Sequence, residues 1–227
     1  MSNDNSQILN LFSDDVIKQL QKGVIPYNTL MSYYRCAIME VETKFNVLNE
    51  ELSIQYDRNP IETIKSRLKK PKSIGEKLVR LGLKVTMENI EEHLNDVAGI
   101  RVICSFPQDV YMLADALLNQ DDIRLIAKKD YIANPKPNGY RSLHLIIGIP
   151  IFLAKEKREM KVEIQLRTIA MDFWASLEHR LRYKKDGHFT DYMANELLEC
   201  AQMSAELDKR MQNLRNMVEN STDCEKN

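Results

Sequence analysis

Long apolar stretches are missing from this sequence of 227 residues, and none approaches the roughly 20 residues that a membrane-spanning helix needs. The first ten residues, MSNDNSQILN, are polar and contain no basic stretch followed by an apolar one, so we expect no secretion signal. A formal net charge of −1 provides no overall attraction to nucleic acid or to an acidic membrane. We therefore expect a cytoplasmic protein that requires no nucleic acid, in which anion binding depends on local clusters of Lys and Arg.

Cysteine is also scarce, and no two cysteines form a CxxC pair. The spacing indicates neither a zinc site nor a disulfide framework. We expect the cysteines to be small apolar fillers in a reducing compartment. The four are Cys36, Cys104, Cys200 and Cys224.

The order of the predicted elements comes from apolar periodicity and from turn residues, since the chain has no internal repeats. Strands are predicted at 61–68, 99–106, 123–132, 142–153 and 160–168, and helices at 26–57, 71–81, 87–94, 107–120, 170–184 and 190–220. This order predicts an α/β (α+β) fold with a mixed sheet. We divide the chain into an N-terminal helical extension (1–58), a central domain (59–184) and a C-terminal helical extension (185–227).

A basic segment at 65–84 holds eight Lys or Arg residues against one acidic residue. Arg67 and Lys69 share one side of an extended stretch, while Ser73 and Lys77 share one face at the start of the next helix. A helix N-terminus adds free backbone N–H groups and a positive dipole end. Together these features suit a polyphosphate, and a solvated basic face is the alternative.

Two carboxylates accompany the strands. Asp96 lies just before a predicted strand that contains Arg101, and an Asp at this place is a candidate Mg²⁺ ligand or else a turn residue. On the last predicted strand, Glu163, Gln165 and Arg167 alternate with apolar residues and so share one sheet face. Glu163 is a candidate metal ligand, general base or both, with an ordinary solvated face as the alternative.

The segment KKDYIANPKPNGYRSLH combines a Pro/Gly loop with aromatic and basic side chains. Lys129 precedes the loop, Lys136, Tyr140 and Arg141 lie in it, and His144 lies on the next strand. A tyrosine ring can stack on a base while neighbouring cations bind phosphates. The segment therefore favours a nucleotide site over a plain surface hairpin.

The motif DYIANPKPNGYRSLH, followed by VEIQLRT, resembles the guanosine-site loop and catalytic strand of the RelA/SpoT synthetase domain. SRLKKPKSIGEKL and DVAGIRV resemble its ATP-site elements, and the resemblance runs from about residue 60 to residue 184. MDFWASLEHRLRYK is similar to the small single-domain members, closer to the RelP type than to the RelQ type. The resemblance implies a nucleotidyltransferase-like mixed sheet flanked by helices. It also implies transfer of pyrophosphate from ATP to the 3′-hydroxyl of GDP or GTP, with release of AMP.

Matching positions carry over roles for both substrates. For ATP, the resemblance implies that Arg67 and Arg101 sandwich the adenine, and that Lys69, Ser73 and Lys77 hold the phosphates. For catalysis, it implies that Asp96 and Glu163 bind Mg²⁺ and that Glu163 activates the acceptor hydroxyl. For the acceptor, Tyr140 is expected to stack on guanine. The residues expected to help bind or support the acceptor are Lys129, Lys136, Arg141, His144, Gln165 and Arg167.

Several features bear on the finer assignment. None of His93, His144, His179 and His188 is followed by Asp, which a family hydrolase domain would need for its metal, so we expect synthesis without hydrolysis. Position 172 is Asp where RelQ-type members usually have Asn. Two other classes stay open, an inactive nucleotide- or RNA-binding regulator and a helical scaffold. The presence of both Asp96 and Glu163 favours the enzyme.

The last predicted helix carries an apolar stripe at three- and four-residue spacing. We expect it to form either a core contact or a subunit contact, and the resemblance implies a homotetramer. The stripe comprises Leu197, Cys200, Ser204, Leu207, Met211, Leu214 and Val218.

Overall fold

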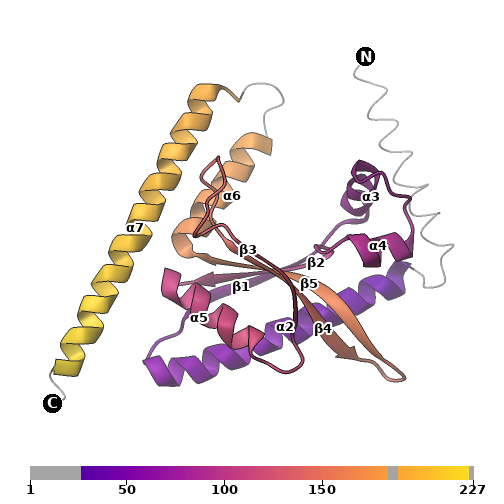
Figure 1. Cartoon of the computed structure of the whole chain (residues 1–227), viewed down its shortest axis with the longest axis horizontal. Coiled ribbons are helices and arrows are strands. Elements are labelled where there is room, and N and C mark those ends of the chain that lie inside the picture. Colours follow the sequence, from indigo (N-terminus) through magenta and orange to yellow (C-terminus); the bar gives the residue numbers. More distant parts are fainter. Residues whose placement is uncertain (1–26, 184–188, 225–227) are drawn as a thin grey trace.

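The computed structural model describes residues 27–183 and 189–224, and within them a single mixed sheet has the strand order β1-β2-β5-β4-β3 (Figure 1). The strands are β1 (Ile61–Leu68), β2 (Ala98–Cys104), β3 (Arg124–Asp130), β4 (Leu143–Phe152) and β5 (Lys157–Thr168). The helices are α2 (Tyr27–Tyr56), α3 (Pro71–Arg80), α4 (Met87–His93), α5 (Pro107–Leu118), α6 (Ile169–Tyr183) and α7 (Asp191–Cys224). The predicted fold class is confirmed.

The sheet is mixed because only β2 and β5 run parallel, while the other three pairs are antiparallel. The β4–β5 hairpin is tighter than its charged tip predicts. Phe152 pairs with Lys157, and the Leu153 N–H donates to the Glu156 carbonyl at 2.8 Å. β5 therefore begins at Lys157, three residues before the predicted start.

One face of the sheet is covered by α2 and α5, which lie beneath it in Figure 1. Helix α2 places Leu30, Tyr34, Val41 and Phe45 in the same apolar core as the strands, each at most 1% exposed. Residue spacings of four and seven bring these side chains to one side of the helix. The segment predicted as an N-terminal extension thus supplies much of the core, and the three-part division stays a prediction.

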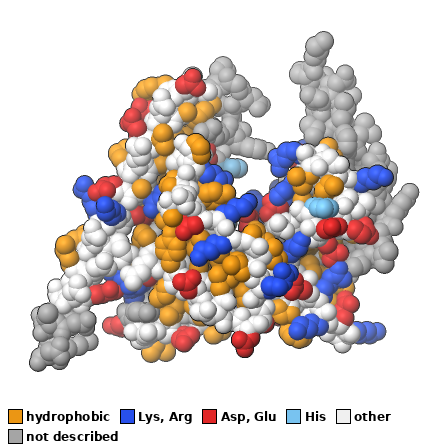
Figure 2. All heavy atoms as spheres, viewed as in Figure 1, with side chains coloured by type: hydrophobic (Ala, Val, Ile, Leu, Met, Phe, Trp, Pro, Cys, Tyr) orange, Lys and Arg blue, Asp and Glu red, His pale blue; other side chains and the backbone are white. Residues whose placement is uncertain are grey.

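The opposite face of the sheet is flanked rather than covered. Helices α3 and α4 stand at one end of it, and α6 and α7 stand at the other (Figure 1). Figure 2 shows the surface hollowed between these two ends, with basic and acidic side chains gathered in the hollow. The polar residues on this face of the strands therefore line an open floor, that is, a sheet surface that no helix covers, between one pair of helices at each end.

Helix α7 turns a different face inward from the one that its apolar spacing predicts. Ala201 and Asp208 are buried and Arg215 is nearly so, at intervals of seven residues. By contrast, Leu207 and Leu214 are 55% and 54% exposed, so these two members of the stripe lie outside the core, and of the two expected alternatives only a subunit contact suits them. The inward stripe was missed because two of its members are charged and find their partners on distant elements.

The cysteines also depart in part from the prediction. Cys104 is buried and Cys36 half-buried, as expected of fillers, but Cys200 is exposed. These three described cysteines are free thiols, which agrees with the absence of a disulfide framework. In the part of the chain that the structure describes, no helix combines the length and apolar character needed to cross a bilayer.

A buried ion cluster fastens α7 to the rest of the fold. The carboxylate of Asp109, in the first turn of α5, is fully buried and accepts hydrogen bonds from Arg58 at 2.7 and 2.9 Å and from Arg215 at 3.0 Å. Both guanidinium groups also lie over the Phe106 ring, at 5.5 and 5.1 Å from its centroid. One carboxylate therefore joins three separate segments.

Asp109→Asn should lower the free energy of unfolding by about 3 kcal/mol, because it leaves two guanidinium groups facing a neutral partner in a mostly buried site. Denaturant unfolding measures this loss. Asp115→Asn, on the exposed side of the same helix, is the matched control and should change the free energy by less than about 0.5 kcal/mol. Equal effects of the two substitutions would contradict a stabilising role for the cluster.

Candidate active site

A row of polar side chains crosses all five strands on the open face. The register pairs Lys65 with Arg101, Arg101 with Gln165, Gln165 with His144 and His144 with Lys129. Residues paired across neighbouring strands point to the same face, so these five lie side by side. The row brings together predicted ATP-site and acceptor-site residues from both halves of the sequence.

A second row lies one step nearer to α3. There Arg67 pairs with Gly99, and Gly99 pairs with Glu163. A Cβ atom added at Gly99 would meet nothing closer than the Arg67 carbonyl at 3.7 Å, so the floor between the arginine and the carboxylate is open. Glu163 thus faces a free space bordered by a cation.

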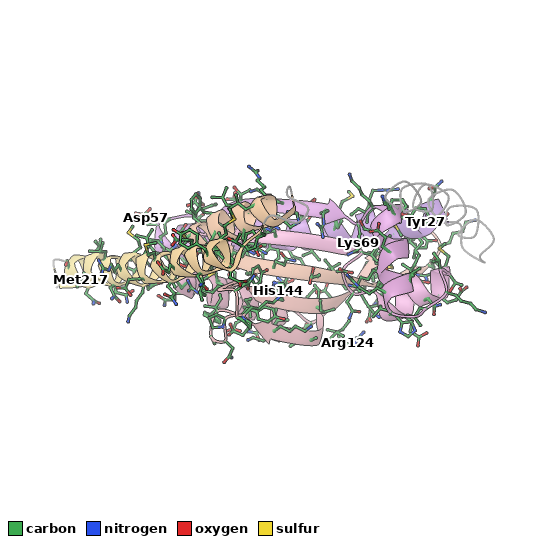
Figure 3. All side chains as sticks on the ribbon, turned by 90° about the horizontal axis from the view of Figure 1, so that it is seen from above. Tyr27, Asp57, Lys69, Arg124, His144 and Met217 are labelled. Carbon is green, nitrogen blue, oxygen red and sulfur yellow. The ribbon has the colours of Figure 1, made fainter. Side chains whose placement is uncertain are left out.

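Asp96 lies at the α3 end of this floor, between two lysines. Its carboxylate oxygens are 2.7 Å from Lys69 Nζ and 2.8 Å from Lys77 Nζ. Burial raises the pKa of Asp96, but the hydrogen bonds and charges of the two lysines outweigh burial and hold the pKa below its ordinary value. The Asp96 carboxylate is therefore ionised, and it holds the ammonium groups of both lysines close together (Lys69 is labelled in Figure 3).

Ser73 lies in the first turn of α3, half-buried, one turn before Lys77. The helix begins with Pro71 and has no side-chain cap, so its first backbone N–H groups stay available to a ligand. This end of the sheet therefore combines lysines, a hydroxyl and a helix N-terminus, as a polyphosphate requires.

Glu163 belongs to a closed ring of polar contacts with four other side chains. Gln165 Nε2 donates to Glu163 Oε2 at 3.1 Å, and Arg167 Nη2 donates to Gln165 Oε1 at 2.9 Å. Arg167 Nη2 also donates to the Tyr140 hydroxyl at 2.5 Å, and that hydroxyl is 2.8 Å from His144 Nε2. His144 Nδ1 lies 3.5 Å from Glu163 Oε1 and closes the ring.

The ring controls the ionisation of Glu163. Burial raises the pKa of this carboxyl, but the hydrogen bond and charge of His144 and the hydrogen bond from Gln165 together hold the pKa below its ordinary value. The charge of Asp96 acts in the opposite direction, which indicates that the two carboxylates lie near each other. Glu163 is therefore ionised and held in one orientation by its neighbours.

Asp172, on the first turn of α6, is a residue of the site for which no role was predicted. It accepts hydrogen bonds from Arg101 at 3.0 Å and from Arg167 at 3.2 Å, and Lys65 Nζ lies 3.5 Å away. Burial and the charge of Arg167 lower the pKa of Arg101, while the charge of Asp172 opposes them. Cations outnumber carboxylates here, so the pocket wall favours an anionic ligand.

Tyr131 is a second residue that sequence reasoning missed. Its ring packs edge-to-face against Tyr140 at 6.0 Å and against His144 at 5.3 Å. Lys136 Nζ lies 4.6 Å from the centroid of Tyr131 and 4.9 Å from that of Tyr140. Tyr131 lies in the motif DYIANPKPNGYRSLH together with Tyr140. The presence of two tyrosines in one loop motif was the signal available in the sequence.

Arg141 departs from the rest of the predicted acceptor site. Its guanidinium is turned toward α7, where Nη1 donates to Asp208 Oδ2 at 3.2 Å. Lys136 and His144, by contrast, both contact Tyr140 in the ring around Glu163. The structure thus brings the other predicted residues to the open face and leaves Arg141 at its edge, with the guanidinium against α7.

The donor set fits a magnesium ion shared with a nucleotide. Mg²⁺ takes one or two carboxylates and completes its octahedron with phosphate oxygens and water. Asp96 and Glu163 are both ionised, and both face the open floor. Within residues 27–183 and 189–224 no group of three or more metal-ligating side chains occurs, so a metal here would draw its remaining ligands from substrate or water.

The fold and this cation-rich floor with two carboxylates define a nucleotide-processing site, and comparison with known proteins identifies the family. Residues 66–188, more than half of the chain, match the description "Region found in RelA / SpoT proteins". The chain belongs to the RelA/SpoT family.

Individual relatives are similar over most of their length. The GTP pyrophosphokinase YwaC of Bacillus subtilis is 44% identical over 186 residues, which cover 82% of this chain and 89% of that protein. The crystal structure of small alarmone synthetase 2 from Bacillus subtilis is 43% identical, with a TM-score of 0.75, covering 82% of this chain and 96% of that one. Small alarmone synthetase 1 bound to its product pppGpp is 34% identical, with a TM-score of 0.74, covering 82% of this chain and 94% of that one.

The ion pairs of Asp96 give a pH-dependent prediction. Because its folded-state pKa lies below the ordinary value of 3.8, the carboxylate stabilises the fold above that value, and this contribution is lost as pH falls through the lowered pKa. Urea unfolding of wild type and Asp96→Asn in metal-free buffer, from about pH 7 to about pH 3, measures it. The difference in free energy should shrink as pH falls, and a difference that stays constant would contradict the assignment.

Proposed function

We propose that the chain is a (p)ppGpp synthetase that transfers the pyrophosphate of ATP to the 3′-hydroxyl of GDP or GTP and releases AMP. The observation that carries the proposal is the position of Glu163. It lies between the lysines around Asp96 on one side and the aromatic loop around Tyr140 on the other. One carboxylate thus faces both a polyphosphate-binding region and a base-binding region.

On the ATP side, Lys69, Ser73 and Lys77 bind the phosphates at the start of α3. Arg67 and Arg101 lie on neighbouring strands and take opposite faces of the adenine. Asp96 and Glu163 would hold Mg²⁺, which would neutralise charge on the transferred phosphates. The lysines add to this neutralisation.

On the acceptor side, the Tyr140 ring stacks on guanine, Lys129 and Lys136 contribute positive charge, and the His144 ring contacts the Tyr140 hydroxyl. Glu163 accepts the proton of the acceptor 3′-hydroxyl. The oxygen of that hydroxyl attacks the β-phosphorus of ATP, and the bond between the β-phosphorus and the oxygen of the leaving AMP breaks. Gln165, His144 and Arg167 orient Glu163, so the attacking oxygen is directed in line with the leaving group. Such transfer depends mainly on positioning and electrostatics and needs no covalent nucleophile.

The central test is incubation with labelled ATP, Mg²⁺ and GDP or GTP, followed by separation of the nucleotides. AMP and a guanosine 3′-pyrophosphate should appear together and only with Mg²⁺. Glu163→Gln keeps the side-chain volume and removes the charge, so it should reduce kcat by at least about a hundredfold while the thermal unfolding profile persists. Turnover of ATP without a guanosine product, or an active Glu163→Gln, would refute the proposal.

Several finer properties belong to the same proposal. We infer an enzyme of the RelP type that acts in the cytoplasm and requires no nucleic acid. The sequence supports synthesis without hydrolysis, since none of the four histidines precedes an Asp. In the same assay, purified (p)ppGpp should therefore stay intact.

We also infer that copies of the chain associate, as the homotetramer implied by the family resemblance requires. An apolar groove lies between α6, α7 and the chain around Arg58 and Phe106. Phe173, Met203 and Leu207 line it and are 66%, 64% and 55% exposed. Such a continuous apolar patch is typical of a subunit contact.

Met211→Glu should shift the protein toward smaller species in light scattering coupled to size-exclusion chromatography, because it places a charge in the groove. Gln202→Glu is the matched control. It adds the same charge nine residues away, about two and a half turns, on the opposite side of α7. An unchanged mass for Met211→Glu, or an equal shift in both variants, would contradict association through this groove.

A further inference from the structure

Helix α7 lies outside the segment that matches the family, yet together with α6 it fastens the far end of the acceptor loop. Four consecutive loop residues each contact one of the two helices. Asn138 Nδ2 donates to Glu178 Oε1 at 3.2 Å, and Tyr140 packs against a cluster formed by Trp174, Ala175 and Ala201. Gly139 and Arg141 make the closest approaches to α7.

Gly139 allows the loop to lie directly on the helix. A Cβ atom at this position would be 2.4 Å from Ala201 Cβ and 3.2 Å from Leu198 Cδ1, which is too close for any side chain. Its φ of +86° is also in the region that favours glycine. The path of the loop just before Tyr140 is therefore set by the surface of α7.

Asp208 is the polar anchor of this contact. Its side chain is 7% exposed, and Oδ2 accepts hydrogen bonds from Thr168 Oγ1 at 2.9 Å and from Arg141 Nη1 at 3.2 Å. Thr168 follows Arg167 at the end of β5, and Arg141 follows Tyr140 in the loop. One buried carboxylate thus holds the catalytic strand and the acceptor loop at a fixed separation.

We propose that Asp208 is a positioning residue for the acceptor nucleotide, acting through Arg141 and Thr168 to hold Tyr140 in the ring around Glu163. The inference rests on the proposed function, because it takes Tyr140 as the guanine contact. Arg141 acts here as a link to α7 rather than as a phosphate ligand. Loss of the link loosens the loop at Arg141, next to Tyr140, while the residues around Asp96 keep their places.

Calorimetric titration with GDP and, separately, with α,β-methylene ATP tests the inference on Asp208→Asn, which keeps the volume and removes the charge. Affinity for GDP should fall about tenfold, the equivalent of one charged hydrogen bond, while affinity for the ATP analogue changes less than about twofold. The matched control is Glu206→Gln, which removes an exposed carboxylate from the same helix and should leave both affinities unchanged. Equal losses for both nucleotides, or no loss for GDP, would overturn the inference.

Arg141→Met approaches the same link from the loop and guards against an Asp208 variant that fails to fold. If Asp208 acts through Arg141, the double variant binds GDP no more weakly than the weaker single variant. Additive losses would mean that Arg141 contacts the nucleotide itself and would refute the positioning role. A wild type that binds GDP but forms no product would refute the proposed function and leave this comparison intact, whereas a wild type without affinity for GDP would overturn both.

Discussion

A guanidinium buried at the end of a strand needs partners for its donors, and Arg167 finds them in both halves of the site. Arg167 is 4% exposed and donates to the hydroxyl of Tyr140. It also donates to Asp172, which binds Arg101, and to Gln165, which binds Glu163. Each of these partners is fixed because Arg167 cannot turn to solvent. Asp172, Gln165 and the loop that carries Tyr140 therefore share one rigid reference point.

One face of the sheet stays open because the apolar side chains of the strands lie on the other face, where they pack against helices. The alternating apolar residues of β2, β4 and β5 point to α2 and α5, which leaves the other residues of each strand without a covering layer. Charged side chains on that face are stable only if they pair or stay wet. Asp96 and Asp172 pair with five cations between them, and the surplus of positive charge is what a polyphosphate can neutralise.

The sequence was sufficient for the elements and for one side of the site. Period-two alternation placed Glu163, Gln165 and Arg167 on one face, and the basic segment placed Lys69 and Lys77 near the start of a helix. These predictions depend only on alternation along a strand and on position within a helix, and the structure has the same strand and the same helix.

Partners far apart in the sequence could not be found in this way. Arg101 and Asp172 are 71 residues apart, and Arg141 and Asp208 are 67 apart. Nothing local in α7 indicates that Asp208 faces inward, because apolar periodicity favours the neighbouring stripe. Burial of a charge depends on the partner that another element supplies, and only the assembled fold shows that partner.

Helix α7 therefore has two faces with different demands. Ala201, Asp208 and Arg215 bind it to the acceptor loop, β5 and α5, while Leu207 and Met211 leave an apolar strip exposed. A helix moves as a unit, so a partner copy on the exposed strip would act on the same body that positions Tyr140. Any effect of association on acceptor affinity must then be matched by an equal effect of the acceptor on association, because the two binding free energies are linked.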